Sequence, residues 1–268
     1  MTPSRSTARA WGGYCIAADR HARERGRHEA LALGLVPAAL VLVHGLWHGA
    51  WSWDLVRTRL AGAECIAVDL PMTALEDDVA AVRQVLDTLP GPVVLAAHSY
   101  GGAVITAAGE HPAVRALVYL AAFQLAPGES ISRAVPEAEL APTALAEALR
   151  FSPDRSEVSI DPELGRTLLY GKADPATADA QLARTRPVAR SLFSATVTTS
   201  AWQHRPSTYV VCSEDRCVSP DLQRAMAARA TRSLEWACDH TPLISAADRV
   251  ARLLAEQARE QGRAREDR

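Results

Sequence analysis

Ser99 stands where a serine can become a nucleophile. It follows the apolar run 93–97 and precedes two glycines and the helix-like run 103–108. This order predicts a strand, a sharp turn and a helix, with Ser99 at the apex of a strained turn that projects its hydroxyl outwards. The segment 97–101 reads Ala-His-Ser-Tyr-Gly, a variant of the G-x-S-x-G nucleophile elbow with alanine in the first small position. A structural serine in a strand–helix turn is the alternative.

His240 is the best candidate for a base that accepts the proton of Ser99. A free serine hydroxyl is a poor nucleophile at neutral pH and needs such a base. His240 stands on a short loop between a predicted strand, 233–236, and a helical pattern that begins at Leu243. A histidine held only for structural reasons is the alternative.

The base needs a carboxylate to fix its tautomer and to stabilise the imidazolium. Asp215 lies three residues past Cys212, at the end of a predicted strand, and Glu214 beside it is the fallback. Asp239 is disfavoured because neighbouring side chains point apart. Asp69 also ends a predicted strand, and we expect it to have a structural role or to lie at the edge of a pocket.

Two backbone amides are expected to stabilise an oxyanion, as acyl transfer at a serine requires. The elbow supplies the N–H of Tyr100, and the loop after the first predicted strand supplies the N–H of Leu46. Gly45 lets that loop approach closely. His44 and His48 on the same loop could indicate a metal site, but no acidic or cysteine residue accompanies them to complete a set of ligands. We expect His44 to hold the loop by hydrogen bonds instead.

These residues need a scaffold, and the pattern around them predicts a doubly wound, mainly parallel α/β sheet. Short, continuously apolar runs are typical of strands buried on both faces, and here they alternate with helical periodicity. Ligands bind at the carboxyl ends of such strands, where Leu46, Ser99, Asp215 and His240 fall. The expected strands cover 38–43, 65–68, 93–97, 114–121, 209–212 and 233–236, and the expected helices include 51–61, 77–89, 220–230 and 243–256.

Residues 124–200 differ from this pattern. Helical stretches such as 136–149 and 176–182 occur, and no convincing strand is visible, so we expect a helical cap inserted into one domain that spans 37–258. Residues 1–36 are expected to be a poorly ordered extension and 259–268 a charged tail. Three aromatic side chains are candidates for the lining of an apolar pocket: Trp47, Phe123 and Trp202. The alternative is that they pack in the core or hold the cap on the sheet.

Composition limits the function classes. The 268 residues are 48% hydrophobic and carry a net charge of −2, so a sizeable core is available and no nucleic-acid partner is expected. The chain has 5 cysteines without metal-ligand spacing, which favours reduced thiols and a cytoplasmic location. No apolar run is long enough for a membrane span.

Four segments together resemble the α/β-hydrolase superfamily, in particular the branch of plant methylesterases, hydroxynitrile lyases and related bacterial esterases. They are 41–53 (VLVHGLWHGAWSW), the elbow with His98 before Ser99, 209–216 (YVVCSEDR) and 239–242 (DHTP). The resemblance implies Ser99, Asp215 and His240 as a catalytic triad and the amides of Leu46 and Tyr100 as an oxyanion hole. The hydroxynitrile lyases of this branch have threonine at the position of Gly45 and lysine at that of Thr241, so the resemblance favours ester hydrolysis.

The sequence therefore predicts a serine hydrolase that cleaves a small to medium, largely apolar carboxylic ester or lactone through an acyl-enzyme. The alternatives are a lyase, cyclase or dehydratase that uses His240 as a base, and a protein that only binds a ligand. No cofactor and no metal is implied. The expected partner is a small-molecule substrate. The sequence leaves the oligomeric state open, and a homodimer is one of the alternatives.

Overall fold

A computed structural model describes residues 37–60, 62–135 and 143–263. The predicted extension 1–36 lies outside these residues, as do residues 136–142, the first half of the predicted helical stretch 136–149. Of the helices in the described part of the chain, none combines the length and the apolar character that a membrane span needs.

Six parallel strands form the central sheet, in the order β2-β1-β3-β4-β8-β9. They correspond to the six predicted strands, and the mainly parallel α/β sheet is confirmed. Their bounds are β1 Ala39–Val43, β2 Cys65–Val68, β3 Val93–His98, β4 Val114–Leu120, β8 Ser207–Cys212 and β9 Arg232–Trp236.

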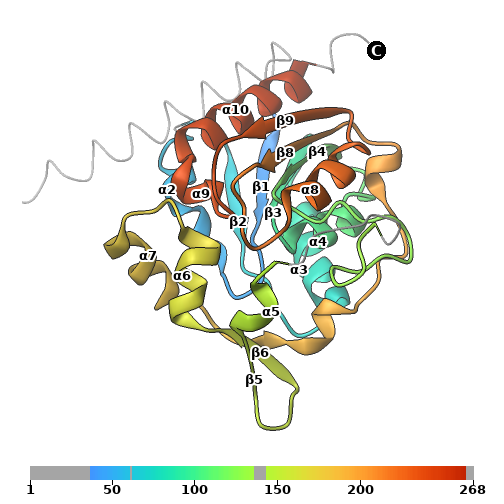
Figure 1. The fold of residues 1–268 in the computed structure, drawn as a ribbon. Coiled ribbons are helices and arrows are strands. Elements are labelled where there is room, and N and C mark those ends of the chain that lie inside the picture. Colours follow the sequence, from blue (N-terminus) through green and yellow to red (C-terminus); the bar gives the residue numbers. More distant parts are fainter. Residues whose placement is uncertain (1–36, 61, 136–142, 264–268) are drawn as a thin grey trace, which may run out of the picture.

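Helices cover both faces of the sheet (Figure 1). One apolar cluster joins the sheet to α3, α4 and α8, and a second joins its other face to α2, α9 and α10. Because β1 and β3 are buried along their whole length, both read as continuous apolar runs. The helix bounds are α2 Asp54–Arg57 after the 3₁₀ turn η1 Ala50–Trp53, α3 Leu75–Asp87, α4 Gly101–Ala108, α8 Pro220–Ala227, α9 Pro242–Ser245 and α10 Ala247–Arg263.

The segment between β4 and β8 forms the cap, and one expectation about it was wrong. Of the predicted helices it contains 176–182 within α7 and, from 136–149, only a short helix at 145–148, but it also contains a three-stranded antiparallel sheet, β5-β6-β7. In β6 only Val158 and Ile160 are buried, and this alternation over four residues is too short to stand out against the polar residues around it. The bounds are α5 Leu145–Ala148, β5 Leu149–Phe151, β6 Glu157–Ile160, α6 Pro162–Tyr170, α7 Pro175–Leu182, β7 Val188–Ala189, η2 Arg190–Phe193 and η3 Ala201–Gln203.

Close backbone contact fixes the start of α4 against the neighbouring strands. A Cβ built on Gly101 would lie 2.6 Å from the carbonyl oxygen of His44 and 2.7 Å from that of Val43. A Cβ on Gly102 would lie 2.6 Å from the backbone nitrogen of Phe123. Neither clash can be relieved by a side-chain rotation, so the two glycines allow the elbow to sit directly against its neighbours.

The substitution Gly101→Ala should therefore lower the free energy of unfolding by about 2 kcal/mol or more, because backbone atoms must move to admit the methyl group. Gly91→Ala is the matched control: no atom lies within 4 Å of its Cβ position. That variant should stay within about 0.5 kcal/mol of the wild type. Urea unfolding followed by circular dichroism measures both, and equal stabilities would contradict this account of the elbow.

Candidate functional site

Ser99 lies at the junction of β3 and α4 with a φ of +53°, a left-handed conformation that is strained for a residue with a side chain. Neighbouring backbone holds it there. Its N–H donates to the carbonyl of Leu120 (3.3 Å), and its carbonyl accepts from the N–H groups of Gly102 (2.9 Å) and Phe123 (3.1 Å). The predicted strand–turn–helix is thus present, with Ser99 at its apex.

Three side chains from separate loops meet in one hydrogen-bonded chain. The Nε2 atom of His240 lies 3.1 Å from Oγ of Ser99, and its Nδ1 atom lies 2.7 Å from Oδ2 of Asp215. The loops after β3, β8 and β9 supply them, all at the carboxyl edge of the sheet. All three residues are buried, and Ser99 is the most exposed at 8%. Such a chain can remove a proton from the serine hydroxyl and hold the resulting positive charge.

The Asp215 carboxylate is fully hydrogen-bonded. Its Oδ1 accepts from the N–H groups of Cys217 (2.7 Å) and Val218 (2.9 Å), and Oδ2 also accepts from Nε2 of Gln223 (2.7 Å). Gln223 is itself completely buried, and its Oε1 accepts from the N–H of Cys212 (2.8 Å). These donors stabilise the ionised carboxylate and aim one of its oxygens at His240.

The other acidic candidates are engaged elsewhere. Glu214 pairs with Lys172 at 2.6 Å. Asp239 accepts from the Oγ of Ser245 (2.6 Å) and the N–H of Lys172 (2.8 Å). Asp69 accepts from the N–H of Ala50 at 3.0 Å, in agreement with a structural role at the edge of the site. Of the four acids, Asp215 alone is hydrogen-bonded to His240 among the described contacts.

Electrostatics set His240 apart from the other buried histidines. Burial disfavours its charged form, but the Asp215 carboxylate and the side-chain hydrogen bonds to Asp215 and Cys217 outweigh burial and raise the pKa of His240 well above its usual value. Burial lowers the pKa of His98 well below its usual value and that of His48 to about 3. Both therefore stay neutral, and His240 is the imidazole that this site equips to carry a proton.

The loop after β1 passes directly against Ser99. A Cβ on Gly45 would lie 2.8 Å from the Cβ of Ser99, so only glycine fits without displacement. This contact brings the backbone of residues 45–46 to the serine, as the sequence predicts. The Nδ1 atom of His44 donates to the carbonyl of Gly45 (2.9 Å), and its Nε2 accepts from the N–H of Leu70 (3.0 Å). His44 thus holds the loop by hydrogen bonds, as expected.

Tyr100 is anchored from the opposite side. Its hydroxyl donates to Oδ2 of Asp78 (2.6 Å), whose Oδ1 accepts from the N–H of Met72 (2.8 Å). Asp78 is completely buried on the core-facing side of α3, and burial raises its pKa. The carboxyl group therefore ties the elbow to α3 and to the loop after β2.

His98 connects the elbow to the His240 loop. Its Nε2 atom donates to the carbonyl of His240 (2.7 Å), and the two ring centroids lie 4.8 Å apart. The side chain is completely buried. His98 thus fixes the backbone that carries His240, a contact that the sequence does not reveal.

The three predicted pocket residues have different surroundings. Trp47 is buried beneath the cap, where its Nε1 donates to the carbonyl of Val158 (3.1 Å). Phe123 lies beside the elbow through its backbone hydrogen bond to Ser99. Trp202 donates to the carbonyl of Leu125 (2.7 Å), and no contact described for it reaches Ser99 or His240. Their role in binding a substrate stays a prediction.

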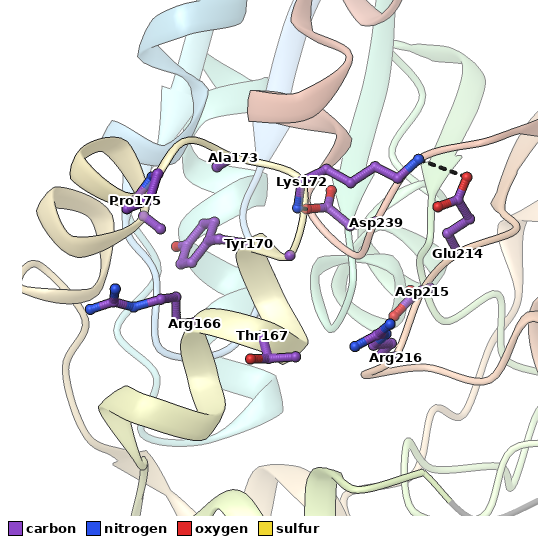
Figure 2. Close-up of a pocket in the computed structure, with 12 residues that line it drawn as sticks. Arg166, Thr167, Tyr170, Lys172, Ala173, Pro175, Glu214, Asp215, Arg216 and Asp239 are labelled. Atoms are coloured by element: carbon purple, nitrogen blue, oxygen red, sulfur yellow. Dashed lines mark hydrogen bonds and ion pairs between the residues drawn. The ribbon is translucent and has the colours of Figure 1, made fainter.

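A cavity of about 610 Å³ adjoins Asp215 between the cap and the loops after β8 and β9 (Figure 2). Figure 2 shows Tyr170 and Arg166 from α6 on one side and Asp239 and Arg216 on the other. Lys172 reaches across to Glu214. Trp47, Phe123 and Trp202 are not among the residues that line it.

Sequence reasoning missed Gln223 and Asp78, and a signal existed for one of them. Asp78 stands within the apolar stripe of α3, between Leu75 and Val82, where a carboxylate needs a buried partner. Gln223 gives no such signal, because a glutamine in a surface-type helix such as α8 is ordinary.

Comparisons with known proteins agree with this architecture. The profile described as "Alpha/beta hydrolase family" matches residues 40–253. Methylesterase 7 of Arabidopsis thaliana is 31% identical over 252 residues, covering 81% of this chain and 95% of that protein. Alpha/beta hydrolase nvfD of Aspergillus novofumigatus is 27% identical and covers 84% of this chain and 98% of its own. The crystal structure of polyneuridine aldehyde esterase has a TM-score of 0.73 at 22% identity, over 82% of this chain and 98% of that one, which shows a common fold.

The raised pKa of His240 yields a direct test. Replacing Asp215 with asparagine removes the carboxylate that favours the imidazolium, so the NMR titration of His240 should move to lower pH. Glu110→Gln is the control, because Glu110 pairs with the distant His204. A His240 titration that is unchanged in Asp215→Asn would contradict this electrostatic account.

Proposed function

The chain belongs to the alpha/beta hydrolase family, and on this premise we propose that it is a serine esterase that cleaves a small to medium, largely apolar carboxylic ester or lactone. The observation that carries the proposal is the buried hydrogen-bonded chain from Ser99 through His240 to Asp215. Each member comes from a different loop, yet the three meet at the edge of the sheet where ligands of such folds bind.

In the proposed mechanism, His240 takes the proton of Ser99 as Oγ attacks the carbonyl carbon of the ester. Asp215 holds the imidazole in the correct tautomer and stabilises the imidazolium. His240 then protonates the departing alkoxide, and an acyl-enzyme remains on Ser99. A water molecule, deprotonated by His240, attacks the acyl-enzyme. His240 then returns this proton to Oγ of Ser99 as the acid leaves.

The oxyanion of each tetrahedral intermediate is proposed to be held by the N–H groups of Leu46 and Tyr100. The close passage of Gly45 against Ser99 supports the first, and the position of Tyr100 directly after Ser99 supports the second. Gly45 also supports hydrolysis over cyanohydrin cleavage, because the hydroxynitrile lyases that the sequence resembles have threonine at this position.

The proposed substrate class rests on the surroundings of the elbow and on the relatives. Leu46 and Trp47 follow Gly45, which passes directly against Ser99, and Phe123 is hydrogen-bonded to Ser99 through its backbone. All three are buried apolar residues. Methylesterase 7 is named for methyl esters. Methyl esters of apolar acids are therefore the first compounds to test, followed by other alkyl esters and lactones.

Labelling with a fluorophosphonate tests the nucleophile. We expect one adduct on Ser99, located by peptide mapping, and slower labelling by at least about 100-fold in His240→Ala. Ser99→Ala should lose hydrolysis of the best methyl ester by several orders of magnitude. Ser194→Ala is the control, because this exposed cap serine should leave labelling and turnover unchanged. Full activity of Ser99→Ala would refute the mechanism, and turnover without any adduct would favour lyase or cyclase chemistry with His240 as base.

The pH dependence of kcat/KM should follow His240. The neutral imidazole is the active form of the base, and Asp215 raises its pKa, so activity should increase with pH through the His240 titration. In Asp215→Asn the rising limb should move to lower pH while the plateau falls by about 10⁴-fold. A rising limb that moves to higher pH in Asp215→Asn would contradict the conclusion that Asp215 raises the pKa of His240.

A further inference from the structure

The loop that carries Leu46, one of the two proposed oxyanion donors, is held by His48, which is in turn held by the cap. The Nδ1 atom of His48 donates to the carbonyl of Leu46 (2.7 Å), and its Nε2 accepts from the hydroxyl of Tyr170 at the end of α6 (2.6 Å). His48 and Tyr170 are both at most 2% exposed. This contact joins residues that lie 122 positions apart in the sequence, and through His48 it connects the cap with the Leu46 carbonyl.

The two peptide planes that flank Leu46 are each fixed by a histidine. His44 donates to the carbonyl of Gly45, in the same peptide group as the N–H of Leu46, and His48 donates to the carbonyl of Leu46 itself. Together these bonds define φ and ψ of Leu46 and thus the direction of its N–H. Such donors must be aligned in advance, because an oxyanion hole acts through preorganisation.

We propose that Tyr170 is a positioning residue of the oxyanion hole, acting through His48 on the Leu46 peptide, an inference that rests on the proposed esterase function. Tyr170 fixes the orientation of the His48 ring, and the ring fixes the carbonyl of Leu46. The cap thus contributes to transition-state stabilisation through a side chain that does not touch the reacting atoms.

The protonation states fit this arrangement. Burial lowers the pKa of His48 to about 3, so the ring is neutral, with a proton on Nδ1 for Leu46 and a lone pair on Nε2 for Tyr170. Burial raises the pKa of Tyr170, so its hydroxyl keeps the proton that it donates. Neither group titrates in the range where an esterase works, and the connection should persist throughout it.

The next residue of the loop depends on the cap as well. Trp47 has a φ of +65°, which is strained for a tryptophan. Its indole donates to Val158 of β6 (3.1 Å), and its carbonyl accepts from the N–H of Arg186 (3.0 Å). The cap therefore supplies two hydrogen bonds that hold Trp47 in this conformation, and Tyr170 is the cap residue that acts on the Leu46 peptide through His48.

Tyr170→Phe removes one hydroxyl and leaves the ring that fills the site. We expect kcat for the best methyl ester to fall about 10-fold while KM stays within about twofold, because the loss concerns the transition state. The affinity of a trifluoromethyl ketone, which forms a tetrahedral oxyanion on the serine, should fall by a similar factor. Tyr119→Phe is the matched control: Tyr119 is another buried tyrosine, and its hydroxyl bonds to Thr106 in the core (3.0 Å).

A second background tests the route through His48. His48→Asn keeps an N–H donor near the carbonyl of Leu46, but its shorter side chain places no acceptor at the position of Nε2, where the Tyr170 hydroxyl donates. In this background Tyr170→Phe should cause no further loss of kcat or of inhibitor affinity. An equal loss in both backgrounds would overturn the route through His48.

The failure of the inference is distinguishable from that of the proposed function. If Ser99→Ala abolishes activity but Tyr170→Phe matches the wild type in kcat and inhibitor affinity, the esterase stands and the role of Tyr170 is overturned. If the wild type neither hydrolyses esters nor binds the ketone covalently, both are overturned.

Discussion

The buried hydrogen bond between Asp215 and His240 is the interaction on which the site depends. A carboxylate that is taken out of water is costly unless its oxygens are fully satisfied. The amides of Cys217 and Val218 and the side chain of Gln223 meet that requirement. The loop after β8 and the position of α8 are therefore determined by the same carboxylate that orients the imidazole.

Four buried histidines surround the serine, and their environments give them different tasks. The rings of His48, His98 and His240 form a row, with centroids 5.9 and 4.8 Å apart. Only His240 has a carboxylate partner in this row, so it alone is equipped to become an imidazolium. Its neutral neighbours donate to backbone carbonyls and fix the loops around it. A positive charge on either neighbour would oppose the charge on His240, and burial prevents this.

Much of this arrangement follows from sequence, and the reasons are local. Ser99 and Asp215 each follow a short buried strand, and His240 follows the last strand of the sheet, so the order of strands brings them to one edge of the sheet. Leu46 and Gly45 follow the first strand for the same reason. The contacts of Gln223, His98 and Tyr170 could not be predicted in this way, because each joins elements whose relative placement depends on packing between distant segments. The small cap sheet escaped detection since β6 shows only two alternating buried residues.

The hydrogen bonds between the cap and the loop of Trp47 and His48 also bear on how such enzymes can be redesigned. An exchange of caps between relatives is an obvious way to change the substrate range. In this chain a foreign cap without counterparts of Tyr170, Val158 and Arg186 would lack the three residues that hold the loop beside the serine. The cap and residues 47–48 therefore form one transferable unit, and a chimera must carry both parts from the same parent to keep its rate.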